Sequence, residues 1–264
     1  MTRSTPPAST AISVQVDGPI GRITLDRPEK LNALNRAALE ELASAAAWFD
    51  GQPTVKVVIV DGAGPSFSAG FDLGDPTWAE LGPLEESAGV GRAMAEAIGG
   101  MAAITIASIG GHCIGGGVVL ASACDLRIAS AGAVFRIPEV GLGIPLYWTG
   151  IPRLTRELGP ALTKELVLTG RPFDAAEARS MRFVNRVVPD AELRSGTDAL
   201  AAELASKPAL VLRTTKSQVE EASPPLPPTD PGAGADISAF GAALSDEEGR
   251  AAASDYLRSI HTDR

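Results

Sequence analysis

Two glycine-rich segments carry most of the chemistry that this sequence could perform. "GPSFSAGFDLGD" (Gly64–Asp75) follows the apolar run Val55–Val60, and "GGHCIGGGVVL" (Gly110–Leu120) follows a second apolar run. Glycine frees the backbone, so backbone N–H groups could be the functional groups of both loops. Two converging N–H donors could stabilise a carbonyl oxygen that gains charge, an effect worth about 3–4 kcal/mol per donor. Alternatively the glycines only form tight turns, and spacing alone does not decide.

Three other kinds of site fit these loops poorly. Neither loop has the Gly-Lys-Ser/Thr ending of a P-loop or a Gly-x-Gly-x-x-Gly fingerprint with a partner acid. Residues 64–68 begin like the nucleophile elbow of a serine hydrolase, but the last glycine is missing. The sequence holds two histidines, His112 and His261, far apart along the chain. We therefore expect neither a Ser/His triad nor a metal site.

Composition limits the class of protein further. A chain of 264 residues with 45% hydrophobic residues predicts one compact body with a smaller appendage. A net charge of −9 argues against non-specific nucleic-acid binding. Cys113 and Cys124 are expected to be core residues rather than a disulfide. The N-terminal residues resemble no signal peptide and no apolar run could span a bilayer, so we expect a cytoplasmic protein without a membrane partner.

Strand and helix patterns alternate along the first two thirds of the chain. Alternating apolar residues on both sides of 17–19 predict a β-hairpin, and helical spacing predicts a helix over Arg36–Asp50. Further strands are expected at 55–62, 104–110, 125–130 and 133–138, and further helices near 89–102 and 117–123. This order predicts an α/β fold with parallel sheets.

The last third is expected to be mostly helical. A strand-like segment at Phe183–Val188 precedes helices expected at 191–206, 208–221 and 238–260. The Pro- and Gly-rich stretch 222–236 predicts a long exposed loop. The chain is therefore predicted to divide into a core, residues 1–190, and a C-terminal helical region, residues 191–264.

Several segments together resemble the crotonase (enoyl-CoA hydratase/isomerase) superfamily, in order along nearly the whole chain. The matching segments are "ITLDRPEKLNALN", "GPSFSAGFDLGD", "GGHCIGGGVVLASACDLRIAS", "FRIPEVGLGIP", "RPFDAAEARSMRFVNRVVP" and, in the final helix, "SDEEGRAAASDYL". The resemblance implies a spiral core of repeated ββα units. It also implies a homotrimer or a dimer of trimers, with the C-terminal helices covering neighbouring subunits.

The resemblance implies roles for individual residues. The backbone N–H groups of Phe71 and Gly116 would hold the thioester carbonyl of an acyl-CoA substrate, and Glu139 would be the catalytic carboxylate. A groove for the CoA part would be lined by Glu29, Lys30, Leu31, Ser68, Gly70, Asp72 and Leu73. CoA would enter as part of the substrate, with no separate cofactor and no metal. Alternatively Glu139 is a structural acid, paired with Arg136 or exposed, and Asp72 only braces its loop.

Two departures from the family pattern bear on the reaction. The second carboxylate of hydratases normally lies three residues after the second donor, and this position is Val119. Hydration needs two acid/base groups, whereas a shift of a double bond needs one, and each such group contributes about 10²–10⁴-fold. Tyr147 and Trp148 stand where relatives have small residues. They either narrow or plug the acyl pocket, or pack under the next helix.

We therefore expect an enzyme that holds a thioester enolate and moves a double bond from Δ3 to Δ2. An enoyl-CoA hydratase with atypical acid/base residues remains an alternative, as does an acyl-CoA-binding protein without turnover. Arg153 and Arg156 are expected on a solvated helix face, and His112 is expected to be structural.

Overall fold

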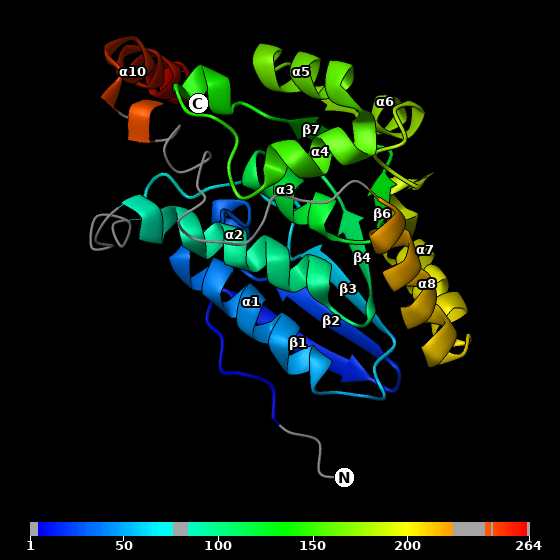
Figure 1. Ribbon diagram of the computed structural model, residues 1–264. Helices are drawn as coiled ribbons and strands as arrows, with labels where there is room; N and C mark the ends of the chain where they lie inside the picture. The colour runs from blue at the N-terminus through cyan, green and yellow to red at the C-terminus, as the bar shows by residue number, and fades with distance from the viewer. Residues whose placement is uncertain (1–4, 76–83, 224–240, 244, 263–264) are drawn as a thin grey trace.

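A six-stranded sheet forms the centre of the protein. The computed structural model describes residues 5–75, 84–223, 241–243 and 245–262 (Figure 1). The sheet has the order β1-β2-β3-β4-β6-β9. β1 and β2 are antiparallel, and every later pair is parallel. The bounds are β1 (Ile12–Asp17), β2 (Ile20–Leu25), β3 (Val57–Gly62), β4 (Ile104–Ile109), β6 (Leu126–Ser130) and β9 (Arg186–Val188). The predicted hairpin and the predicted parallel α/β arrangement are confirmed.

A smaller sheet lies beside the first. It consists of β5 (His112–Ile114), β7 (Val134–Arg136) and β8 (Phe173–Asp174), with β7 in the middle. β5 was not predicted, because three residues between glycines are too few to show an alternating pattern. This short strand is nevertheless important, because it lies within the second glycine-rich loop.

Helices cover both faces of the large sheet. α1 (Arg36–Asp50) and α2 (Leu84–Gly100) run side by side over one face, as Figure 1 shows, and α7 (Leu193–Ala205) packs on the other. Side chains along β3 alternate accordingly: Val58 and Val60 join the larger core, whereas Val57 and Ile59 join a cluster with α7. The sheet is thus buried on both faces, as expected for parallel strands.

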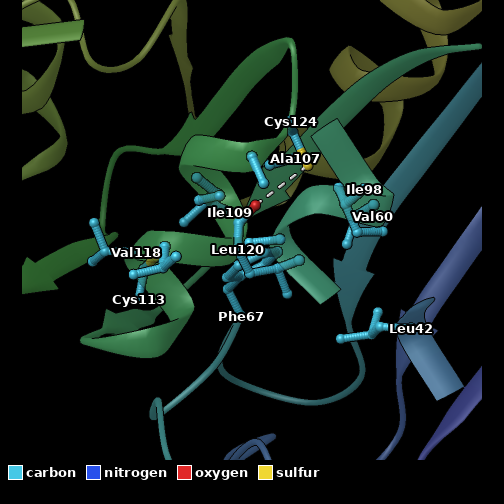
Figure 2. Packing of buried hydrophobic residues seen from close by; sticks show 14 of the residues in the cluster. Leu42, Val60, Phe67, Ile98, Ala107, Ile109, Cys113, Val118, Leu120 and Cys124 are labelled. Carbon is cyan, nitrogen blue, oxygen red and sulfur yellow. Dashed lines mark hydrogen bonds between the residues drawn. The ribbon is translucent and has the colours of Figure 1, made fainter. Parts of the chain in front are cut away.

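Both cysteines lie in the larger core, as predicted. Cys113 and Cys124 are buried free thiols, and Figure 2 shows them among aliphatic side chains. The Sγ atom of Cys124 donates a hydrogen bond to the carbonyl oxygen of Leu120 at 3.6 Å. Burial raises the pKa of Cys124 to about 12, so its thiol stays protonated at neutral pH.

The remaining helices surround this core. They are α3 (Gly116–Ala123), α4 (Gly150–Leu158), α5 (Pro160–Thr169), α6 (Ala175–Ser180), α8 (Ala209–Ala222) and α10 (Glu247–Thr262), with the 3-10 helices η1 (Pro28–Lys30), η3 (Glu139–Leu142) and η4 (Asp190–Glu192). α7 and α8 confirm two expected helices, and α10 covers residues 247–260 of the third. Most of the predicted loop 222–236 lies outside the described residues, and the division at residue 190 stays a prediction. None of the helices in the described ranges is long and apolar enough to cross a membrane.

Asn32 ties the turn after β2 to the loop after β3. Its side chain is buried and its backbone has a φ of +56°, a left-handed conformation that asparagine tolerates better than most residues. The Nδ2 atom donates to the carbonyl oxygens of Ala63 and Ser66, both at 2.8 Å. The Oδ1 atom accepts a hydrogen bond from the N–H of Arg27 at 3.0 Å. One side chain therefore fixes two segments that the first glycine-rich loop needs.

We expect Asn32→Ala to lower the free energy of unfolding by about 2–4 kcal/mol, because it leaves buried backbone groups without partners and places alanine at a positive φ. Urea denaturation measures this change. Asn35→Ala is the matched control: Asn35 caps α1 by accepting a hydrogen bond from the N–H of Ala38, so its loss should cost about 1 kcal/mol. Equal costs for the two variants would contradict the tying role of Asn32.

Candidate functional site

The two glycine-rich loops are joined by backbone hydrogen bonds. The N–H of Ser68 donates to the carbonyl oxygen of His112 at 2.9 Å, and the N–H of Ile114 donates to that of Ser68 at 3.0 Å. Gly70 follows with a φ of +85°, and a Cβ atom there would lie 2.5 Å from the oxygen of Ile114 and 3.3 Å from the nitrogen of Gly116. Glycine is thus required at position 70, and the two loops meet at this point.

The backbone at Phe71 forms a parallel β-bridge with Leu34. Leu34 bonds to both neighbours of Phe71: its N–H donates to Gly70 O at 2.7 Å, and its carbonyl oxygen accepts from the N–H of Asp72 at 3.1 Å. Because successive amides of an extended chain point to opposite sides, the Phe71 N–H is directed away from Leu34.

Gly116 is the first residue of α3. The first N–H groups of a helix have no acceptor within the helix, and the helix dipole favours negative charge there. Gly115 precedes α3 with a φ of +48°, and its carbonyl oxygen accepts from the N–H groups of Val118 and Val119. Both segments that carry a predicted donor therefore lie at one place, next to Gly70.

Glu139 lies beside this place with its carboxylate buried. It begins η3, and a Cβ atom at Gly115 would overlap its Oε1 atom. Its Oε2 atom is buried and has no hydrogen-bond partner among the described residues. Burial removes water from the carboxylate and raises its pKa to about 7, and this effect outweighs a hydrogen bond from its own backbone N–H, which lowers the pKa. A carboxylate with this pKa can take up or release a proton near neutral pH.

One of the structural alternatives for Glu139 is contradicted by its burial. The side chain is 9% exposed, so the interpretation as an exposed acid is wrong. The Nε atom of Arg136 donates to the carbonyl oxygen of Gly170 at 2.7 Å. Burial, rather than a neighbouring cation, dominates the environment of the Glu139 carboxylate.

Val119 is fully buried on α3, in the larger core. The position three residues after Gly116 therefore holds an apolar side chain that can neither donate nor accept a proton. This confirms the expectation that Val119 is a core residue.

Four of the residues predicted to line the CoA groove lie at the surface. Glu29, Lys30 and Leu31 belong to or follow η1, and Leu73 is 50% exposed. The carbonyl oxygen of Leu31 accepts a hydrogen bond from the N–H of Ala69 at 2.8 Å, so η1 lies next to the first glycine-rich loop. These residues thus form an accessible edge beside the site.

Ser68 and Asp72 instead support the loop from within. The Oγ atom of Ser68 is buried, donates to the carbonyl oxygen of Asn32 at 2.9 Å and accepts from the N–H of Gly70 at 3.1 Å. The carboxylate of Asp72 pairs with Arg27 at 2.9 Å and also accepts a hydrogen bond from the backbone. For Asp72, the structure thus contains the bracing contacts that the alternative interpretation requires.

The side chain of Trp148 packs against the first residue of α3, Gly116. It is 6% exposed, and a Cβ atom at Gly116 would lie 2.8 Å from its Cη2 atom and overlap Cζ3. Its ring meets that of Phe71 edge to face, with 6.1 Å between centroids. Tyr147, beside it, is partly buried against the same core.

The expectation for Arg153 is wrong. Arg153 is 8% exposed, and its guanidinium donates to the Oγ1 atom of Thr149 at 3.1 Å and to the carbonyl oxygen of Ala95 at 3.0 Å. Burial lowers its pKa. Charged neighbours such as Arg156 and Glu157 favour an exposed face in the sequence, and only the fold reveals the two acceptors. Arg156 is more accessible and pairs with Glu220.

A large cavity lies elsewhere, between α2, α4 and α8. Its volume is about 1230 Å³, and its lining includes Asp125 and Lys216, which form an ion pair with each other. It adjoins the last residues of α3, whereas Gly116 begins that helix, about 10 Å away at 1.5 Å per residue. The cavity extends to Thr149 and Arg153, but Gly70, Phe71, Gly116 and Glu139 are not among its lining residues.

Comparison with known proteins identifies similar chains. A profile of the family described as "Enoyl-CoA hydratase/isomerase" matches residues 15–257. A Mycobacterium bovis protein named "Probable enoyl-CoA hydratase echA8" is 38% identical over 214 residues, which cover 80% of this chain and 81% of the relative.

Solved structures are similar as well. A Thermobifida fusca YX protein assigned as an enoyl-CoA hydratase, crystallised in complex with CoA, has a TM-score of 0.76 and 30% identity, covering 98% of this chain and 99% of that chain. A monofunctional enoyl-CoA isomerase of M. smegmatis has a TM-score of 0.68 and 28% identity, covering 80% and 93%. The similarity therefore extends over nearly the whole fold.

The burial of Glu139 predicts a specific dependence of stability on pH. Its pKa rises from 4.5 in the unfolded chain to about 7 in the folded protein. Between these values the folded protein retains a proton that the unfolded chain has released, so the free energy of unfolding falls as pH rises. One pKa unit corresponds to about 1.4 kcal/mol, so the loss is about 3 kcal/mol and is complete above pH 7.

Glu139→Gln removes this loss. The free energy of unfolding of the variant, relative to that of the wild type, should therefore increase by about 3 kcal/mol as the pH rises from 4.5 to 8. Urea unfolding across this range measures the difference. Glu165→Gln is the control, because it removes a carboxylate that pairs with Arg171 on the surface. An unchanged difference between wild type and Glu139→Gln at all pH values would show that the carboxylate is not buried as described.

Proposed function

Because the chain belongs to the enoyl-CoA hydratase/isomerase family, within the crotonase superfamily, we propose that it moves the double bond of an enoyl-CoA from Δ3 to Δ2. The observation that carries this proposal is the buried carboxylate of Glu139 beside the meeting point of the two loops, the one buried carboxylate among the residues that the structure describes. The place of a second acid is occupied by the core residue Val119.

Each step of the proposed reaction needs only groups at this site. The carboxylate of Glu139 takes a proton from C2, and the electrons of the C–H bond delocalise into the thioester carbonyl. The enolate oxygen accepts hydrogen bonds from the N–H groups of Phe71 and Gly116, and the start of α3 favours its negative charge. Glu139 then returns the proton at C4, so that the double bond lies between C2 and C3.

The pKa of Glu139 suits both halves of this reaction. With a pKa of about 7, the carboxylate is basic enough to remove a proton and its acid form can give the proton back. An ordinary exposed glutamate would be a weaker base. The rate should therefore require the ionised form of Glu139 in the free enzyme.

Hydration of a 2-enoyl-CoA is the second candidate reaction, favoured by the name of the M. bovis relative. One group must activate the water while another handles the proton at C2. Valine at position 119 can do neither. Hydration by this chain would therefore need an acid other than those at the described site.

The proposal includes the other components of the reaction. The CoA part of the substrate would lie along η1 and the first glycine-rich loop, with Glu29, Lys30, Leu31 and Leu73 at its edge. No resident cofactor is proposed, and assembly as a trimer or a dimer of trimers stays a prediction.

We expect the purified protein to isomerise a 3-enoyl-CoA at least about 100-fold faster than it hydrates a 2-enoyl-CoA, because one acid/base group is missing for hydration. Glu139→Gln should lower isomerisation by about 10²–10⁴-fold and leave binding of the CoA ester intact. Separate assays of the two reactions, with calorimetry for binding, measure these changes. Glu165→Gln should behave like the wild type.

The pH profile provides a second readout of the same group. The kcat/KM for isomerisation should rise with pH and level off above about pH 7, as the Glu139 carboxylate ionises. Faster hydration than isomerisation would favour the hydratase. Binding of acyl-CoA without conversion of either substrate would leave only a binding protein.

A further inference from the structure

The indole of Trp148 lies against Gly116 and Phe71, the two residues proposed to hold the thioester carbonyl. We propose that this indole closes the acyl pocket and restricts the protein to short, unbranched acyl-CoA thioesters of about four to six carbons. The inference rests on the proposed function, because it assumes that the thioester carbonyl lies at the N–H groups of Phe71 and Gly116.

The indole is held between two helices. On the α3 side, its Cη2 atom would lie 2.8 Å from a Cβ atom at Gly116. On the α2 side, a Cβ atom at Gly91 would overlap its Nε1 and Cε2 atoms. The ring therefore fits between the helices only because both positions are glycine, since any side chain there would overlap it. Trp148 is 6% exposed.

The same ring adjoins both predicted donors. It lies against Gly116 and meets the Phe71 ring edge to face at 6.1 Å between centroids. Suppose that the thioester carbonyl is bound at these two residues and that C2 is directed to Glu139. The acyl chain beyond C2 then contacts the indole next. Room for C3 and C4 is needed for the reaction itself, and further methylenes would compete with the ring.

The position of the indole is enforced by the backbone. Trp148 and Thr149 have φ values of +59° and +61°, a left-handed conformation that bulky residues rarely adopt. The buried Arg153 holds this turn by donating to Thr149 Oγ1 at 3.1 Å and to the carbonyl oxygen of Ala95, on α2, at 3.0 Å. Strain that persists under such restraint is typical of functional positions. Because turn and ring are both fixed, the indole cannot easily swing aside for a long chain.

The chain-length profile of the wild type tests the inference first. A series of 3-enoyl-CoA esters from C4 to C10 should show kcat/KM falling at least about 100-fold, since one misplaced methylene in an apolar pocket already costs about 10–200-fold. Dissociation constants of the matching saturated acyl-CoA esters, measured by calorimetry, should follow the same order. Equal kcat/KM and equal affinity for C4 and C10 would overturn the inference.

Two variants then test the residue itself. Trp148→Gly removes the ring and suits the positive φ, so it should reduce the preference for C4 over C10 at least about ten-fold. Trp148→Phe keeps an aromatic ring of smaller size and should give an intermediate ratio. Trp48→Phe is the matched control. α1 begins at Arg36, close to Leu34, which pairs with the Phe71 segment, and Trp48 lies about 18 Å farther along this helix.

The outcomes separate this inference from the proposed reaction. An unchanged C4-to-C10 ratio in folded Trp148→Gly, or in Trp148→Phe if the glycine variant does not fold, would overturn the role of the indole while isomerisation stands. If no ester is converted but C4 binds far more tightly than C10, and Trp148→Phe reduces that difference, the proposed reaction fails and the chain-length limit holds.

Discussion

The hydrogen bonds between Ser68 and β5 are the constraint on which the site depends. They place the first glycine-rich loop along the second, so that Gly70 lies against the beginning of α3. Each loop follows a strand of the large parallel sheet, so both emerge at the same edge of that sheet. Without this pairing, nothing would hold the loop segment at Phe71 next to the one at Gly116. With it, two backbone segments and the carboxylate of Glu139 lie together although they are far apart in the sequence.

Burial of Glu139 links stability with the proposed chemistry. The Oε2 atom of Glu139 has no hydrogen-bond partner among the described residues. The ionised carboxylate therefore destabilises the folded protein, because removing a charge from water is costly. The same loss of solvation raises its pKa to about 7 and makes the carboxylate a better base. A local violation of the rule that buried charges are paired is typical of functional sites. Arg153 is the contrasting case, because two hydrogen-bond acceptors compensate its burial.

Periodic patterns in the sequence predicted the elements, and they did not predict contacts. The hairpin, α1 and the buried strands follow from spacing that one element determines by itself. β5 has three residues and no periodicity, and its existence depends on pairing with β7 and Ser68. The burial of Arg153 depends on acceptors from α2 and from the turn before α4. The left-handed backbone conformation at Asn32 and Trp148 could not be predicted from the amino-acid composition, although asparagine before a small residue is compatible with it.

The run of glycines at 115–117 bears on the two interpretations that spacing left open. Gly115 makes room for the carboxylate of Glu139, Gly116 makes room for the indole of Trp148, and a Cβ atom at Gly117 would lie 2.9 Å from that of Ser68. Close packing therefore accounts for all three glycines without any appeal to catalysis. Yet what they pack against is the predicted acid, the residue that would limit the acyl chain and the loop that carries the other donor. The same three glycines therefore serve the packing and, under the proposal, the chemistry, because the absence of side chains lets the acid, the indole and the first loop lie close to this segment.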